Sequence, residues 1–165
     1  MKTVFIDRDG VINRRLVGDW VKSWQEFEML PGVPEAISKL KAAGYRCILI
    51  TNQRGISLGL FDFDQLNEIH GTMNESFKQN GGGKIDDIFI CPHDRHHNCD
   101  CRKPQPGLFF QAAEKYKDIS LPETVMFGDK ETDRDAAAAA GCGKFFMVSD
   151  KCTLLDCVEE FLTQK

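Results

Sequence analysis

The sequence has no run of apolar residues that approaches the length of a membrane-spanning helix, so we expect no membrane partner. It has no excess of basic residues either. Its formal net charge at pH 7 is -4, so we expect no binding of nucleic acid. The amino end carries no apolar secretion signal, and the seven cysteines are odd in number. Both features favour a protein of the reducing cytoplasm over a disulfide-bonded secreted one.

The residues that are present suit one folded unit. With 42% hydrophobic residues, the chain 1–165 can bury a substantial core as a single domain. Apolar strand patterns alternate with helical patterns along the chain, which predicts an α/β fold with a parallel sheet. The expected strands are residues 3–6, 45–50, 85–90, 124–127 and 144–148, and the expected helices are 34–43, 62–80, 107–117, 132–140 and 153–162. Asp62 and Gln65 have the spacing of a capping box for the second helix.

Two carboxylates stand at the end of the first expected strand. The apolar residues 3–6 lead directly into Asp7 and Asp9, which are followed by a glycine. Desolvated carboxylates cost free energy unless a cation or dense hydrogen bonding compensates them, so this pair predicts a bound metal. A calcium loop is the alternative for an Asp-x-Asp-Gly string, but Val11 and Ile12 stand where further oxygen ligands would be needed.

Other polar residues follow later strands in the same way. Thr51 follows the second strand, and Asp129 follows the fourth, with Asp133 four residues on. Lys103 precedes Pro104, which we expect to open the next helix nearby. Each residue alone also suits an ordinary role in a turn, a helix cap or the solvated surface. Because the ligand crevice of a parallel sheet lies at the carboxyl ends of its strands, the ordered set predicts one site.

A second group of polar residues lies in the loop 91–101. It consists of two pairs, Cys91 with His93 and Cys99 with Cys101, each with one intervening residue. Three thiolates and an imidazole suit tetrahedral Zn²⁺, and a site with four protein ligands is structural. Disulfides or spare thiols are the alternative, and His96 or His97 competes with His93 for the metal. Zinc here would hold the loop that leads to the following lysine.

The acids, the hydroxyl and the lysine in this order resemble the catalytic set of the haloacid dehalogenase superfamily, over nearly the whole chain. The resemblance implies a Rossmann-like, doubly wound, mainly parallel sheet of five main strands in the order 5-4-1-2-3. It also implies a capless member of the superfamily, because the chain has no room for a cap domain. The implied activity is magnesium-dependent hydrolysis of a phosphomonoester through an aspartyl-phosphate intermediate.

The same resemblance implies a role for each motif residue. Asp7 is the nucleophile and a Mg²⁺ ligand, and Asp9 is the general acid and base that also lends its backbone carbonyl to Mg²⁺. Thr51 and Lys103 bind the transferred phosphate, and Asp129 is the third Mg²⁺ ligand. A carboxylate can attack phosphorus only where cations neutralise the charge between the two groups, so the set is chemically coherent.

The remaining expectations concern the substrate. The zinc loop resembles the histidinol-phosphatase-like branch of the superfamily, and residues 7–13 and 51–56 resemble those members of the branch that act on a heptose bisphosphate. The short gap between His93 and Cys99 is closer to the members that act on histidinol phosphate, and Leu58 stands where many heptose enzymes have arginine. A nucleic-acid 3'-phosphatase is the third candidate.

The loops near the strand ends are basic, which favours an anionic small molecule over one that carries an ammonium group. We expect a phosphorylated sugar as the partner of a monomeric protein. The expected substrate contacts are Asn52, Arg54, Arg102 and Lys130. Asp133 is expected to support Lys103 or the waters of the metal.

Overall fold

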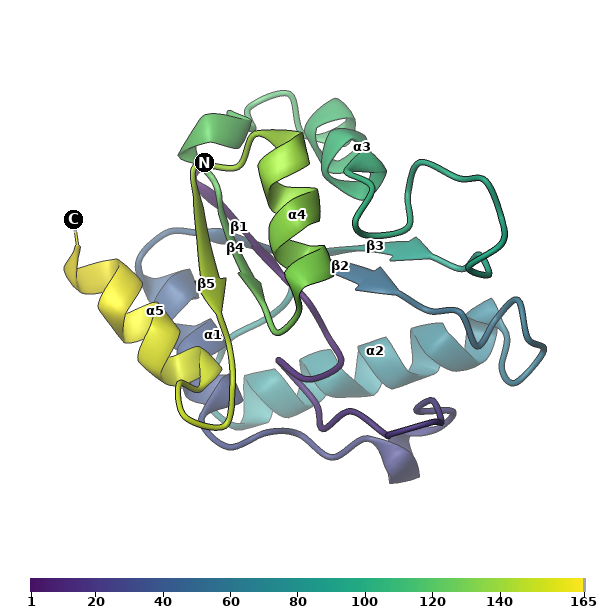
Figure 1. The fold of residues 1–165 in the computed structure, drawn as a ribbon. Coiled ribbons are helices and arrows are strands. Elements are labelled where there is room, and N and C mark those ends of the chain that lie inside the picture. The colour runs from purple at the N-terminus through teal and green to yellow at the C-terminus, as the bar shows by residue number, and fades with distance from the viewer. Residues whose placement is uncertain (165) are drawn as a thin grey trace.

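Five parallel strands form one sheet in the order β3-β2-β1-β4-β5 in the computed structural model, which describes residues 1–164 (Figure 1). This confirms the predicted fold class and strand order. The strands are β1 (Thr3–Ile6), β2 (Arg46–Asn52), β3 (Asp87–Cys91), β4 (Val125–Gly128) and β5 (Lys144–Met147). The helices are α1 (Val33–Ala42), α2 (Phe63–Gln79), α3 (Gly107–Lys115), α4 (Glu131–Ala140) and α5 (Leu154–Thr163), with short 3-10 turns at Trp24–Glu26 and Leu121–Glu123.

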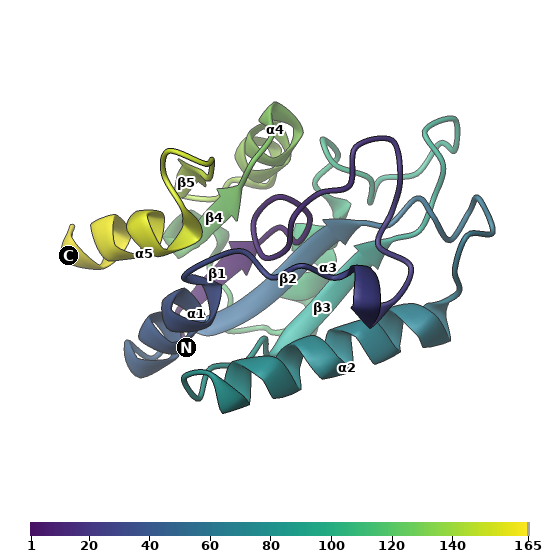
Figure 2. The same ribbon diagram turned by 90° about the horizontal axis from the view of Figure 1, so that it is seen from below.

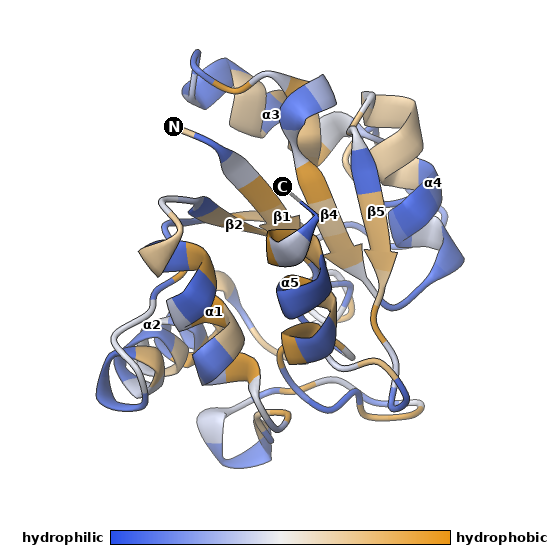
Figure 3. Ribbon diagram, turned by 90° about the vertical axis from the view of Figure 1, so that its left-hand side faces the viewer, coloured by the Kyte–Doolittle hydropathy of each residue, from blue (hydrophilic) through white to orange (hydrophobic). Residues whose placement is uncertain are grey.

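The strands alternate their side chains between two apolar layers. Val4 and Ile6 of β1 pack with α1, α2 and α5 on one face, and Phe5 between them packs with α3 and α4 on the other. Figures 1 and 2 show these two helix layers on opposite faces of the sheet. In Figure 3 the central strands β1 and β4 carry the hydrophobic colour. The sheet is therefore covered on both faces, as a parallel sheet requires.

The helix α2 begins as its sequence predicts. The Asp62 carboxylate accepts a hydrogen bond of 2.8 Å from the backbone N–H of Gln65, and the Gln65 side chain accepts one of 2.9 Å from the backbone N–H of Asp62. This capping box satisfies two of the free N–H groups at the helix start. The apolar stripe of α2 is buried and contains Leu66, Ile69, Met73 and Phe77.

The element boundaries lie within two residues of the predicted ones, and three differences from the prediction concern residues around the site. The strand β2 continues through Thr51 to Asn52, because both residues pair with β3, so Thr51 lies inside the strand and not after it. The strand β3 begins at Asp87 and not at residue 85. Pro104 lies in a turn closed by the N–H of Gln105 on the carbonyl of Arg102, and α3 begins three residues later. The expectation that Pro104 opens the helix was therefore wrong.

Parallel strands place several loop starts at one edge of the sheet. Asp7 follows β1, Asn52 ends β2 and Asp129 follows β4, so their side chains gather where the carboxyl ends of the strands meet. The long loop 10–30 runs past the same edge, and residues from it line the cavity described below. Among the helices of residues 1–164, none is long and apolar enough to cross a membrane.

Candidate active site and zinc loop

One buried lysine joins two of the predicted acids. Lys103 Nζ lies 2.7 Å from Asp7 Oδ1 and 2.7 Å from Asp133 Oδ1, and it donates a third bond of 2.9 Å to the carbonyl of Ile50. Burial opposes the lysine charge, but the two carboxylates outweigh it and raise the pKa of Lys103. The lysine is therefore a fixed cation beside Asp7.

The acids still outnumber the cations at this point. Burial raises the pKa of Asp7 to about 7, since Lys103 offsets only part of that effect and the charges of Asp133 and Asp129 add to it. Burial also raises the pKa of Asp129. Carboxylate oxygens of Asp7, Asp129 and Asp133 lie within 4.8 Å of one another. A hard divalent cation such as Mg²⁺ suits this set of under-compensated oxygens.

The carboxylate of Asp9 is held by three donors. Oδ1 accepts bonds of 2.8 Å from Arg8 Nη2 and 3.0 Å from Asn13 Nδ2, and Oδ2 accepts one of 2.9 Å from Gln53 Nε2. Burial favours the neutral acid, but the charge of Arg8 and the three hydrogen bonds together lower the pKa of Asp9. Asp9 lines the cavity, so this anchored carboxylate faces the space beside Asp7.

Gln53 links Asp9 to Thr51. Its Nε2 also lies 2.9 Å from Thr51 Oγ1, which accepts this bond and keeps its own hydrogen for another acceptor. Both residues are buried. The Thr51 hydroxyl, which the family resemblance implies is a phosphate ligand, is thus oriented by a neighbouring amide.

Arg15 contacts two oxygens of the expected magnesium set. Its Nη2 lies 2.6 Å from the backbone carbonyl of Asp9 and 2.9 Å from Asp129 Oδ1. Asp133, the expected supporting residue, accepts bonds of 3.1 Å from the N–H groups of Asp129 and Lys130 through its Oδ2. Asp133 therefore holds the backbone of the loop after β4. The Asp129 carboxylate of that loop is in turn bonded to Arg15 of the loop after β1.

A cavity of about 770 Å³ opens above these residues. Asp7, Lys103 and Asp133 line it, together with Trp20 and Val21 of the long loop. It is also lined by Asn52 and five cationic side chains, which are Arg15, Arg54, Arg95, Arg102 and Lys130. A ligand with more than one phosphate fits this concentration of positive charge.

The expected substrate contacts sit on a braced loop. Asn52 Oδ1 accepts a bond of 3.1 Å from the N–H of Lys103, and its Nδ2 donates one of 3.2 Å to the carbonyl of the same residue. Arg54 Nε lies 2.5 Å from Asp94 Oδ1. Arg102 Nη1 donates a bond of 3.3 Å to the carbonyl of His93. Two of the arginines are therefore held by residues of the zinc loop.

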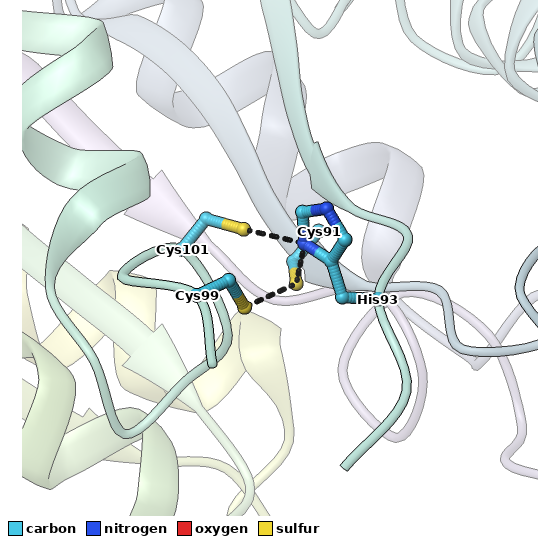
Figure 4. A group of neighbouring side chains, drawn as sticks. All are labelled: Cys91, His93, Cys99 and Cys101. Atoms are coloured by element: carbon cyan, nitrogen blue, oxygen red, sulfur yellow. Dashed lines mark hydrogen bonds between the residues drawn. The ribbon is translucent and has the colours of Figure 1, made fainter. Parts of the chain in front are cut away.

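The four zinc-ligand candidates converge (Figure 4). Their ligand atoms all lie within 4.8 Å of one another. Cys91 Sγ lies 3.9 Å from Cys99 Sγ, and His93 Nδ1 lies 3.2 Å from Cys101 Sγ. Four ligands placed tetrahedrally at about 2.0–2.3 Å from Zn²⁺ stand about 3.3–3.8 Å apart, so the cluster fits this ion. His97 is stacked on His93, with ring centroids 4.3 Å apart. No disulfide is formed by the seven cysteines.

Sequence reasoning gave no site role to four residues that the structure places here. Arg8 lies between Asp7 and Asp9, and Gln53 lies two residues after Thr51, so their positions in the sequence could have indicated a place in the site. Arg15 is one of several basic residues in the loops near the strand ends, and its sequence neighbours do not distinguish it from the others. His70, which lies 3.3 Å from Arg8, sits on the apolar stripe of α2 and carries no local signal.

A parallel sheet with two acids after its first strand, a buried lysine between acids and a cationic cavity above them defines a candidate site for phosphoryl transfer. Residues 19–141 match the haloacid dehalogenase-like hydrolase family, and the chain belongs to this family.

Relatives of known name share most of the chain. It is 42% identical over 147 residues to D-glycero-beta-D-manno-heptose-1,7-bisphosphate 7-phosphatase of Bordetella bronchiseptica, covering 89% of this chain and 80% of that one. It is 38% identical to D-glycero-alpha-D-manno-heptose-1,7-bisphosphate 7-phosphatase of Mycobacterium bovis, covering 84% and 75%. The crystal structure of the B. bronchiseptica D,D-heptose 1,7-bisphosphate phosphatase, complexed with magnesium and phosphate, superposes with a TM-score of 0.91 over all of both chains at 36% identity.

Proposed function

We propose that this protein is a phosphomonoester hydrolase that removes the 7-phosphate of D-glycero-D-manno-heptose 1,7-bisphosphate through a phosphorylated aspartate, Asp7. The observation that carries the proposal is the ion pair of Lys103 with Asp7 on the wall of a cavity rich in cations. The fixed lysine supplies the positive charge that lets an anionic oxygen approach a phosphate.

The residues divide the reaction into two displacements. Asp7 attacks phosphorus, and the bond from phosphorus to the sugar oxygen breaks. Asp9 must enter this step protonated, against the effect of Arg8 on its pKa, and it gives that proton to the sugar oxygen. Asp9 then takes a proton from water, whose oxygen attacks phosphorus and frees Asp7 and orthophosphate. Splitting one difficult displacement in this way lowers each barrier. Lys103 stays beside the phosphate oxygens as a fixed positive charge, and the Thr51 hydroxyl donates a hydrogen bond to one of them.

Two metals belong to the proposal. Asp7 and Asp129, with the backbone carbonyl of Asp9, would hold Mg²⁺, which neutralises charge between nucleophile and phosphate when it is bound. Zn²⁺ would be held by the four ligands of the loop 91–101 and would be structural. We place the reaction in the cytoplasm, with a monomer as the acting unit and residues 1–165 as one domain.

The cavity supports the choice of a bisphosphate. A sugar whose 7-phosphate lies against Lys103 carries a second phosphate at the other end, and this anion needs its own contacts. Arg54, Arg102 and Lys130 line the cavity and can supply charge-assisted hydrogen bonds, each contributing about 1.5–3 kcal/mol when desolvated. Histidinol phosphate offers an ammonium instead, which these cations repel.

The proposal is tested by comparing kcat/KM for three substrates: the heptose 1,7-bisphosphate, histidinol phosphate and a 3'-phosphorylated oligonucleotide. We expect the heptose bisphosphate to exceed each of the others by at least about 100-fold, a difference of about 2.7 kcal/mol. A higher value for either competitor contradicts the substrate. No release of orthophosphate from any of the three with Mg²⁺ contradicts the activity.

A further inference from the structure

We propose that His70 positions the proton donor Asp9 by fixing the side chain of Arg8, an inference that rests on the proposed function. His70 lies in α2, 62 residues along the chain from Arg8. Its Nε2 is 3.3 Å from Arg8 Nη1, and Arg8 Nη2 is 2.8 Å from Asp9 Oδ1. A continuous chain of polar contacts therefore runs from the helix layer to the carboxylate at the cavity.

The direction of the first contact follows from chemistry. A guanidinium only donates hydrogen bonds, so the nitrogen of His70 that faces it must be the acceptor and the ring proton must sit on Nδ1. Burial and the nearby charge of Arg8 lower the pKa of His70 to about 3, which keeps the ring neutral and able to accept. His70 thus offers Arg8 a permanent acceptor at neutral pH.

Arg8 depends on that acceptor. Its side chain is fully buried, and within residues 1–164 its Nε has no hydrogen-bond partner. Nη1 and Nη2 carry the contacts to His70 and Asp9, and they set the direction of the guanidinium. Without the His70 acceptor, Nη1 would be a further buried donor left unpaired, and the group would turn to find a partner.

A turned guanidinium would move the Asp9 carboxylate, because Arg8 supplies one of the three bonds that hold it. Displacement of a reacting group by about 1 Å can cost on the order of 100-fold in rate. His70 is only 4% exposed and does not line the cavity, so it can act on the reaction only through other residues. This makes it a positioning residue.

The test uses the role of Asp9 as proton donor. A sugar alkoxide leaves phosphorus slowly unless it is protonated, whereas the phenolate of p-nitrophenyl phosphate leaves readily without a proton. The value of kcat/KM reports the steps up to the departure of the sugar or phenol oxygen. It is insensitive to the later hydrolysis of the phosphorylated Asp7. We expect His70→Phe to lower kcat/KM for the heptose bisphosphate by about 10- to 100-fold, part of the roughly 10²–10⁴ from positioned proton transfer. The value for p-nitrophenyl phosphate should fall less than about threefold.

Three variants make the result specific. His70→Gln keeps an acceptor on a flexible side chain and should recover most of the lost rate. Ile69→Ala, a buried neighbour on the same helix without polar contacts, should lower thermal stability but leave the ratio of the two substrates unchanged. In an Asp9→Asn background, His70→Phe should have no further effect, because the group that it positions is already disabled.

Two outcomes would overturn the role of His70 and leave the phosphatase function intact. The first is that His70→Phe leaves the ratio of kcat/KM between the two substrates unchanged. The second is that its effect adds to that of Asp9→Asn. Wild-type protein that hydrolyses neither ester in the presence of Mg²⁺ would instead overturn the proposed function, and this inference with it. The two failures are therefore distinguishable in one set of assays.

Discussion

Arg15 Nη2 donates a hydrogen bond of 2.9 Å to Asp129 Oδ1, across 114 residues of sequence. The same nitrogen lies 2.6 Å from the backbone carbonyl of Asp9. Under the proposed function both oxygens are ligands of Mg²⁺. The guanidinium therefore brings positive charge to the oxygens that the metal uses, and the two cations compete for them.

Replacing Arg15 by Met removes this competitor and keeps an unbranched apolar stem. We expect the affinity for Mg²⁺ to rise about tenfold, which is about 1.4 kcal/mol, as measured by titration calorimetry. Arg14→Met is the matched control, because its Nε pairs with Glu28 on the surface at 2.9 Å. Affinity that is unchanged or weaker in Arg15→Met would show that the arginine does not compete with the metal.

Residues of the loop 91–101 hold two arginines of the cavity, so under the proposed zinc site the loss of this metal should affect both stability and turnover. Cys99→Ser is expected to reduce bound zinc from about one ion per chain, to lower the melting temperature, and to decrease kcat. The cause of the lower kcat is that Arg102 is held by the carbonyl of His93 and lies next to Lys103. Cys142→Ser, outside the cluster, should retain zinc and activity. Metal analysis that finds no zinc in the wild-type protein would contradict the assignment.

Acid should destabilise the fold through His70. The pKa of His70 is about 3 in the folded protein and about 6.5 in the unfolded chain, so the unfolded chain takes up the proton first as the pH falls. The stability from this residue is complete above pH 6.5 and is lost progressively down to pH 3. Between pH 7 and pH 5 we expect it to decrease the free energy of unfolding by about 2 kcal/mol.

Urea unfolding at several pH values measures this loss, with His70→Gln as the control that cannot titrate. The difference in slope between the two proteins isolates the histidine, because the carboxylates are common to both. Parallel pH profiles would mean that His70 gains no less charge in the folded state than in the unfolded one.

The second phosphate of the substrate gives Arg54 a measurable role. We expect Arg54→Ala to raise KM for the heptose bisphosphate about tenfold and to change KM for a monophosphate ester less than about twofold, because only the bisphosphate has a second anion. Arg134→Ala, an exposed arginine whose side chain does not line the cavity, should change neither value. Equal effects of Arg54→Ala on both esters would place this arginine at the reacting phosphate.

Local pattern was sufficient for the order and type of the elements. Strand-to-helix alternation predicts the parallel sheet, and the spacing of Asp62 and Gln65 predicts the start of α2, because both depend on neighbours in sequence. The meeting of Asp7 with Lys103 also follows from the sequence, since polar residues beyond parallel strands share one edge. The predicted end of the second strand before Thr51 was wrong. Thr51 continues β2 because it pairs with β3, and the sequence of β2 by itself does not show that pairing.

Contacts between residues far apart in the sequence could not be predicted. Whether Arg15 meets Asp129, or His70 meets Arg8, depends on how a loop or a helix packs against a distant strand end, and no spacing in the chain encodes that. His70 shares the period of the apolar stripe of α2, so by pattern it is one more core position. Only the packed structure distinguishes a core histidine from one that faces a buried guanidinium.

The central claim concerns a covalent bond to Asp7, and trapping this bond tests it most directly. Protein that is turning over the heptose bisphosphate with Mg²⁺ is quenched in acid, digested and weighed by mass spectrometry. We expect the mass of one phosphoryl group on the peptide that contains Asp7, and neither that mass nor orthophosphate release with Asp7→Asn. An Asp7→Asn protein that releases orthophosphate as fast as the wild type, or a phosphoryl group found on another residue, would contradict the account.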